Sequence, residues 1–305
     1  MARRADAQLA GFRVSQILGS TPSGEWVGRQ KRVRHLQTQH SHVGEILTFY
    51  EALLSHQDKV FREAVRSRSF DVAVTYGQFQ GRSVYLSLGR LPLRSREQAF
   101  TAFVKGLPSS ATELLQAIAM RLLDAPTQAG QLLTAAVSGQ SIDEVATELE
   151  CDRLALGFFP KAFLQPIAEA LVRRVTHEVP LDVDRQTHCP YCGSLPQVAV
   201  LQDDADTRGK RTLICSLCAS AWSFARSCCP QCGEEEADQL HYHQTEAWPH
   251  LRVEECHACH RYIKAVDLRI NGLAVPLVDE LASVELDLWA REQKMVKLQK
   301  NVLGL

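Results

Sequence analysis

Two closely similar stretches decide the fold of this chain: Cys189-Pro190-Tyr191-Cys192-Gly193 and, forty residues later, Cys229-Pro230-Gln231-Cys232-Gly233. After 22 residues in the first unit and 23 in the second, another Cys-x-x-Cys pair follows, Cys215/Cys218 and then Cys256/Cys259. The sequence therefore contains a tandem repeat in which each unit supplies four thiols. Two turns that each present two sulfurs are typical of a tetrahedral metal site.

The repeat predicts two metal sites, one in each unit, because each unit contains a complete set of four ligands. An interleaved arrangement, in which the first pair joins the third and the second joins the fourth, is the alternative that cross-braced metal modules suggest. Redox-active dithiols or unrelated buried cysteines are the other interpretation of the pattern. The predicted ligands are Cys189, Cys192, Cys215 and Cys218 for the first site, and Cys229, Cys232, Cys256 and Cys259 for the second.

Other metal-binding side chains crowd the same region, but two sets of four thiolates leave no need for them. Cys228 directly precedes Cys229, and adjacent residues rarely bind one ion with good geometry, so we interpret Cys228 as non-ligating. The nearby histidines are expected to be polar surface or backbone-bonded side chains. They are His188, His241, His243, His250, His257 and His260.

Tetrahedral sulfur ligation favours zinc or a single iron ion. Gly193 and Gly233 each follow the second sulfur of a pair, where glycine lets backbone N–H groups turn toward the thiolates. Rubredoxin-type iron sites and zinc ribbons both use this device. The residues alone therefore leave the choice between the two metals open.

Composition indicates a cytosolic globular protein. The chain has 305 residues, 45% hydrophobic and 23% charged, with a formal net charge of −1, which suits about two soluble domains. Arg3-Arg4 is a twin-arginine pair, but no apolar stretch of export-signal length follows it, and no run approaches the ~18 apolar residues of a membrane helix. We therefore expect reduced cysteines, a cytoplasmic location and no membrane insertion.

The N-terminal part, residues 1–180, is predicted to be an all-helical domain. Its first 40 residues are basic and are expected to form a loosely ordered arm or a solvated helix. Apolar periodicity predicts helices over 45–66, 96–106 and 161–176. Two further helices are predicted by apparent capping boxes, Ser110 with Glu113 and Ser141 with Glu144.

A linker beginning at Pro180 separates this domain from the cysteine region. We expect a first four-cysteine ribbon over 186–227 and a second over 228–272, with short hairpins carrying the sulfurs and metal supplying much of the stability. A last segment, 276–305, should contain one helix over 277–300. The predicted fold class is α+β multidomain: a helical domain, two tandem rubredoxin-like or zinc-ribbon modules and a C-terminal helix.

Charge and motifs narrow the class of function. Residues 189–260 contain ten acidic and five basic side chains, the wrong sign for binding phosphates, so no nucleic-acid partner is expected. No phosphate loop, dinucleotide fingerprint or nucleophile elbow occurs in the sequence. Four-sulfur sites also leave no open coordination position for hydrolytic chemistry. The chain is therefore predicted to be a binding or electron-handling protein rather than an enzyme.

The cysteine region resembles the family of the formate dehydrogenase accessory protein FdhE. The resemblance covers about 188–290, whereas the N-terminal half is compatible only in size and helical character. His260 departs from the family pattern, where a glycine is expected. The matching stretches are His188–Pro196, Cys215–Cys218 with Trp222, Cys229–Cys232, Leu240–Tyr242, Glu255–Cys259, Tyr262–Lys264, Asp279–Ser283 and Leu286-Asp287.

This resemblance implies a cytoplasmic assembly factor that binds the catalytic subunit of respiratory formate dehydrogenase before export by the twin-arginine route. It also implies iron at two mononuclear, rubredoxin-like sites, with zinc as the alternative, and it is compatible with a homo-oligomer. The competing interpretations are a zinc-ribbon nucleic-acid or transcription-associated protein and an iron electron carrier acting alone.

Overall fold

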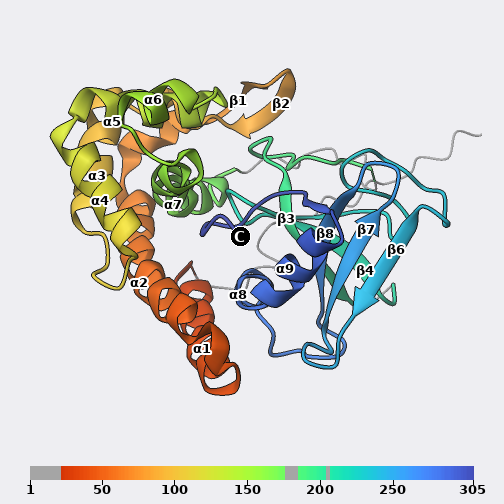
Figure 1. Ribbon diagram of the computed structural model, residues 1–305. Helices are drawn as coiled ribbons and strands as arrows, with labels where there is room; N and C mark the ends of the chain where they lie inside the picture. The colour runs from red at the N-terminus through yellow and green to blue at the C-terminus, as the bar shows by residue number, and fades with distance from the viewer. Residues whose placement is uncertain (1–21, 176–184, 204–206) are drawn as a thin grey trace, which may run out of the picture.

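The computed structural model describes residues 22–175, 185–203 and 207–305. Helices make up most of its N-terminal region, and a twisted sheet with short helices forms the C-terminal region beside it (Figure 1). This is the mixed α+β class that the sequence predicted. Residues 1–21 and the expected linker start at Pro180 lie outside the described residues.

Apolar stripes on long helices build the N-terminal region. Helix α2, predicted over 45–66, is observed at Gly44–Arg66, and helix α3, predicted over 96–106, at Leu93–Lys105. The helix predicted over 161–176 is α7 (Arg153–Val172), which begins earlier and forms the central helix of the region, buried along most of its length. The remaining helices of the region are α1 (Pro22–Gln39), α4 (Glu113–Asp124), α5 (Pro126–Ser138) and α6 (Asp143–Glu148), with 3-10 turns η2 (Ser41–Val43), η3 (Arg68–Ala73) and η4 (Leu88–Arg90).

The helix starts depend on caps that the sequence indicated only in part. Thr112, not Ser110, caps α4, because its hydroxyl accepts the N–H of Leu115 at 3.3 Å. At α6, the predicted box of Ser141 with Glu144 does not form: the N-cap position is Ile142, and the Ser141 hydroxyl accepts the N–H of Asp143 at 3.1 Å. The free N–H groups of a first helical turn donate to whichever short polar side chain the preceding loop places within hydrogen-bond distance.

A β-hairpin interrupts the helical region, so the prediction of an all-helical N-terminal domain was wrong at this point. Strands β1 (Val74–Phe79) and β2 (Arg82–Leu86) pair antiparallel through a tight turn at Gln80 and Gly81. Both turn residues have positive φ, 49° and 76°, as two-residue hairpin turns favour. A Gly-containing dipeptide between two short β-prone runs was the available signal.

Residues 22–39 form helix α1, one of the two structures expected for the basic segment, but this helix is not simply solvated, because Arg29 and Arg32 are buried. Arg29 makes a two-point ion pair with Glu169 of α7, at 2.9 and 3.0 Å. Arg32 pairs with Asp279 at 2.6 Å, and Asp279 also lies 2.8 Å from His250. These buried contacts tie α1 to the central helix and to the C-terminal region.

The two cysteine repeats supply six strands of one seven-stranded sheet. Each repeat is a three-stranded antiparallel meander, and the parallel pairing of β3 with β8, from Val198↔Lys264 to Leu201↔Asp267, joins them. The strand order is β5-β4-β3-β8-β7-β6, with β9 added beside β8. The strands are β3 (Pro196–Gln202), β4 (Lys210–Cys215), β5 (Ala221–Ser223), β6 (Leu240–Gln244), β7 (Leu251–Cys256), β8 (Arg261–Asp267) and β9 (Val296–Lys297).

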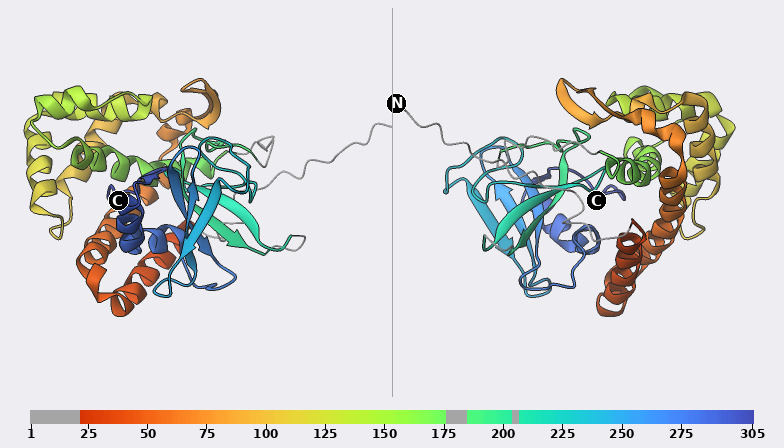
Figure 2. Two further views of the ribbon diagram at one scale, coloured as in Figure 1. Left: turned by 45° about the vertical axis from the view of Figure 1, so that its right-hand side comes forward. Right: turned by 180° about the vertical axis from the view of Figure 1, so that it is seen from behind.

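The C-terminal segment is two short helices and a strand rather than the single helix predicted over 277–300. Helix α8 (Pro276–Ala282) packs between α1 and strands β3 and β8, and α9 (Val284–Glu292) follows it (Figure 2). The break lies at Ser283, whose side-chain oxygen is 3.2 Å from the fully buried Lys264 ammonium. Lys264 also pairs with Asp287 at 2.7 Å, and pairing is what makes such a buried charge tolerable.

Candidate metal centres

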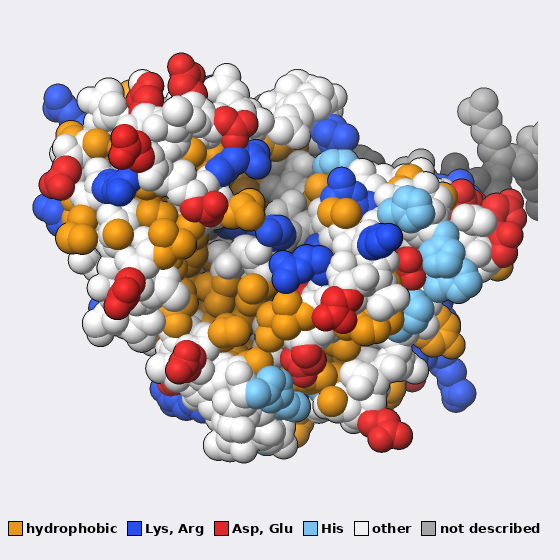
Figure 3. All heavy atoms as spheres, viewed as in Figure 1, with side chains coloured by type: hydrophobic (Ala, Val, Ile, Leu, Met, Phe, Trp, Pro, Cys, Tyr) orange, Lys and Arg blue, Asp and Glu red, His pale blue; other side chains and the backbone are white. Residues whose placement is uncertain are grey.

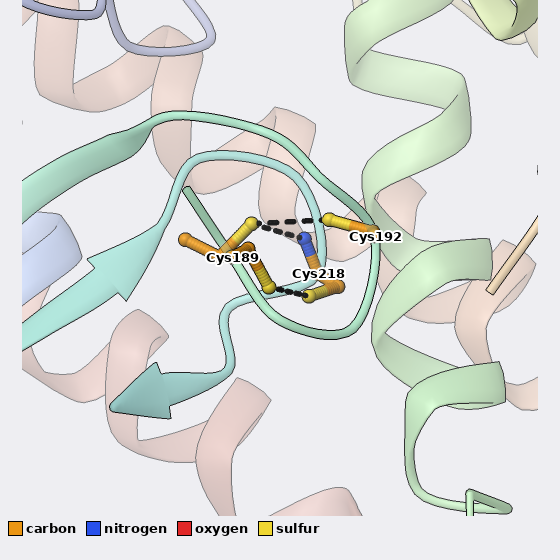
Figure 4. A group of neighbouring side chains, drawn as sticks. Cys189, Cys192 and Cys218 are labelled. Atoms are coloured by element: carbon orange, nitrogen blue, oxygen red, sulfur yellow. Dashed lines mark hydrogen bonds between the residues drawn. The ribbon is translucent and has the colours of Figure 1, made fainter. Parts of the chain in front are cut away.

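The first repeat brings its four predicted ligands into one cluster. The sulfurs of Cys189 and Cys218 lie 3.5 Å apart, those of Cys192 and Cys215 lie 3.4 Å apart, and all four lie within 4.8 Å of one another. Disulfide sulfurs are about 2.05 Å apart, so these thiols are free. Figure 4 shows the labelled side chains converging from two adjacent loops.

The second repeat forms an equivalent cluster. The sulfur of Cys229 is 3.7 Å from that of Cys259, and the sulfur of Cys232 is 3.7 Å from that of Cys256. A tetrahedral ion with metal–sulfur bonds of about 2.3 Å has sulfurs about 3.8 Å apart, so both sets fit a tetrathiolate ion. The grouping is sequential, one cluster per repeat, as predicted, and the interleaved arrangement is not adopted.

The same turn presents the sulfurs in both repeats. The N–H of Gly193 donates to the carbonyl of Cys189 at 2.9 Å, and the N–H of Gly233 donates to that of Cys229 at 3.0 Å. Both glycines have left-handed φ, 77° and 78°, a conformation that costs L-residues free energy. The turn therefore favours a glycine after each first pair.

The second pair of each repeat uses residues other than glycine at the equivalent position. Ala219 follows Cys218 with φ of 52°, and His260 follows Cys259 with φ of 54°. The departure at His260 therefore keeps the left-handed backbone that a glycine would adopt. It leaves the ligand positions unchanged and adds a local conformational cost.

Backbone N–H groups point at the sulfurs and favour their charged form. The N–H groups of Leu217 and Cys218 lie 3.3 and 3.4 Å from the sulfur of Cys215, and the N–H of Gln231 lies 3.4 Å from that of Cys229. Such outer contacts orient ligands and stabilise thiolate charge. These N–H contacts offset part of the electrostatic repulsion among four neighbouring thiolates.

The pKa values of the clustered thiols indicate that full ionisation of each cluster requires a cation. Burial raises the pKa of Cys189 and of Cys218 well above the usual value, whereas hydrogen bonds from the neighbouring thiols hold the pKa of Cys192 well below it. In the second cluster, burial raises the pKa of Cys259 to about 11. Without a metal, four adjacent thiols cannot all ionise, so a divalent cation held there would displace their protons.

Histidines surround the second cluster without joining it. The rings of His241 and His257 stack at 4.2 Å, and the Nε2 atom of His243 lies 3.0 Å from the Glu255 carboxylate. His250 belongs to the buried ion pair with Asp279. Within the described residues, the metal-ligating clusters consist of cysteines alone, and Cys228 lies outside both.

An apolar groove of about 930 Å³ lies apart from the sulfur clusters. It runs between the helical region and the end of the chain, and its apolar floor is visible in the central hollow of Figure 3. Apolar residues that line it include Ile46, Phe49, Leu114, Leu115, Leu154 and Leu303. Leu114 and Leu154 are more than half exposed. Among the described helices, none is both long and apolar enough to span a membrane.

The fold and the sites define a class of protein: a helical region joined to a sheet that carries two tetracysteine centres able to hold metal ions. Residues 188–226 match the family model for the FdhE central domain, and residues 227–303 match that for the FdhE C-terminal domain. Residues 188–303 therefore match the central and C-terminal domains of the FdhE family, as the cysteine motifs indicated.

Individual relatives agree with this assignment. The FdhE homologue of Aquifex aeolicus is 40% identical over 151 residues, covering 49% of this chain and 52% of the relative. The homologue of Pseudomonas aeruginosa is 34% identical over 129 residues, covering 40% and 41%. The chain thus spans about half or less of the length of these curated relatives.

The fold similarity extends beyond the cysteine region. The crystal structure of the FdhE protein from Pseudomonas aeruginosa matches with a TM-score of 0.66, covering 94% of this chain and 97% of that one at 24% identity. The helical region, which lies outside the two matched family models, is therefore part of a shared architecture.

Proposed function

We propose that this protein is a cytoplasmic assembly factor for respiratory formate dehydrogenase. It binds the immature catalytic subunit and holds two metal ions, iron in preference to zinc, in rubredoxin-like sites. The observation that carries the proposal is the occurrence of two complete tetracysteine centres on consecutive FdhE central and C-terminal domains. The identity of the partner and the preference for iron rest on the family resemblance.

Coordination chemistry supports a binding role rather than catalysis. Four thiolates saturate a tetrahedral ion, so neither centre offers the open position that metal-dependent hydrolysis needs. The ion bound by such a site supplies a structural cross-link and, if it is iron, a one-electron couple. The chain's own contribution is to orient the sulfurs through the glycine turns and the N–H contacts.

The positions of the buried arginines argue against the nucleic-acid alternative. Arg29 and Arg32, from the basic N-terminal segment, are engaged with Glu169 and Asp279 inside the molecule. On the sheet, Arg211 is buried and pairs with Glu254 at 2.6 Å. Side chains committed to internal carboxylates do not form the basic face that phosphate binding requires.

Maturation of the enzyme in cells tests the proposal. In a strain lacking this chain, formate oxidation by the membrane enzyme should fall, and the wild-type chain should restore it. The double variant Cys189→Ser/Cys192→Ser removes half of the first ligand set and should fail to restore it. Cys151→Ser, which alters a free thiol outside both clusters, is the matched control and should restore it.

Partner capture and metal analysis complete the test. Pulldown after anaerobic lysis should recover the catalytic subunit, and the same sample should contain about two ions per chain with sulfur alone in the first shell. Normal formate oxidation in the deletion strain would refute the assembly role. Salt-dependent retention of nucleic acid in place of the subunit would favour the zinc-ribbon alternative.

A further inference from the structure

The two centres share one ligand pattern but differ in their access to solvent. All four sulfur-bearing residues of the first centre are at most 5% exposed. In the second centre, Cys232 is exposed and Cys259 is partly exposed, while Cys229 and Cys256 are buried. We propose that the second centre is an exchangeable metal site that passes its ion to or from a thiol-bearing molecule, and that the first is a fixed structural centre.

The helical region encloses the first centre. The carbonyl of Tyr191, between its first two ligands, accepts the N–H groups of Tyr85 and Leu86 of β2, at 2.8 and 2.9 Å. On the other loop, the amide of Gln165 from α7 donates to the carbonyl of Ser216 at 2.8 Å. Both loops that hold the ion are therefore fixed from outside the repeat, and opening them requires breaking contacts between the regions.

The corresponding glycines show the same difference. A methyl group placed on Gly193 would lie 3.0 Å from Phe79 and 3.2 Å from Val84, both in the hairpin of the helical region. On Gly233, with almost the same φ, it would meet nothing within 4 Å. The first loop is packed against a neighbour, whereas the second faces open space.

The second centre is also reachable from its inner side. A cavity of about 210 Å³ lies beside it, lined by residues that include the ligands Cys229 and Cys256, the free thiol Cys228 and the exposed Tyr242. A void of this size exceeds the space that a water molecule needs. An incoming ligand can therefore approach from the exposed Cys232 side or through this cavity.

Exchange at such a site is a ligand substitution. A thiolate of the incoming molecule forms a bond to the ion as the bond to the Cys232 sulfur breaks, and the released thiolate takes up a proton. Repeating the step transfers the ion with its oxidation state unchanged, so no electron donor or acceptor is needed. The partner's chemistry is therefore soft sulfur ligation, which suits the same ions as the centre itself.

Metal release from the whole protein tests the inference, which rests on the proposed function only for metal binding at both centres. The full chain, loaded anaerobically with two equivalents of Zn²⁺, is mixed with glutathione and an excess of a chromogenic zinc chelator. We expect one equivalent to leave at least about tenfold faster than the other, as local opening free energies differ across a fold. Equal rates would overturn the inference.

Pulse alkylation with iodoacetamide, followed by peptide mass spectrometry, identifies the labile centre without any substitution. Cys232 and Cys259 should be labelled during the fast phase, and Cys189 and Cys218 only during the slow phase. Labelling of the first centre at the same rate or earlier would overturn the inference. Cys151, partly exposed and outside both clusters, reports the labelling rate of an unligated thiol.

A matched variant separates the exchange role from metal binding in general. Cys232→Ser should abolish the fast phase and leave the slow equivalent in place, whereas loss of the slow phase instead would overturn the assignment. Because no partner enzyme is present, a negative result would leave the assembly role standing. A chain that binds no metal at either centre would refute both proposals.

Discussion

The first and second cysteine repeats have almost the same local structure and very different surroundings. Each forms a three-stranded meander, and in each a glycine with φ near 77° shapes the first sulfur-bearing turn. The first turn receives hydrogen bonds from β2, while the glycine of the second has open space beside it. The motif therefore sets the same sulfur geometry in both repeats, whereas the rest of the fold sets how far solvent reaches each cluster.

Removing the metals should have the largest effect and should divide the molecule. Chelation under reducing conditions should make residues 188–270 sensitive to protease, because structural tetrathiolate sites contribute about 10–16 kcal/mol of binding free energy. The helical region buries many apolar side chains of its own, in a core that continues into the sheet, and should keep its helical circular dichroism. Loss of both regions in one step, or no change in either, would show that the two regions do not differ in this way.

The buried ion pair between the regions should be the next most sensitive feature. Asp279→Ala leaves Arg32 and His250 without their shared carboxylate, and breaking such a buried pair costs about 3–5 kcal/mol. Urea unfolding measures the loss. Arg34→Ala removes an exposed ion pair to Glu51 and is the control, expected to cost less than about 1 kcal/mol. Equal losses would mean that burial of the junction contributes little.

The two glycine turns offer a direct comparison of the repeats. Both Gly193→Ala and Gly233→Ala impose a left-handed conformation that costs about 1–2 kcal/mol. Gly193→Ala also forces a methyl group against Phe79 and Val84, and overpacking adds about 1–3 kcal/mol. Thermal unfolding of the metal-loaded variants should therefore rank Gly193→Ala as the more destabilised. The reverse order would contradict the packing difference.

The smallest expected effect is a gain in stability. His260→Gly places glycine where φ is 54° and relieves a conformational cost of about 1 kcal/mol, offset in part by the greater chain entropy of glycine when unfolded. Thermal unfolding with both metals bound should show a slight stabilisation. Ala219→Gly tests the same position of the first repeat, and a loss of stability in both variants would exclude backbone strain at these turns.

Sequence reasoning located the sulfur clusters well because their geometry is local. The interval between Cys189 and Cys192 places two sulfurs on one tight turn whatever the rest of the chain does. The helix at 45–66 was found for a similar reason, since its apolar spacing repeats within a few residues. The hairpin at 74–86 was missed because its strands are short and one turn glycine was its main signal.

Features that depend on distant partners could not be read from the sequence. Nothing around Arg32 indicates that its carboxylate partner lies 247 residues away, and a basic segment is ordinarily solvated. The end of α8 at Ser283 has the same origin, because that residue belongs to the network around the buried Lys264. Such pairs form only when the fold has brought both members together.

The sequence by itself determined which eight cysteines cluster, their division into two repeats and the FdhE domains that those repeats match. Only the tertiary structure decided that β3 and β8 join the repeats into one sheet, that α1 is anchored by buried ion pairs, and that one centre is enclosed while the other is partly exposed. The physical reason is the distance along the sequence over which each feature depends on other residues. Turn geometry depends on a few neighbouring residues, whereas burial depends on which distant surfaces pack together.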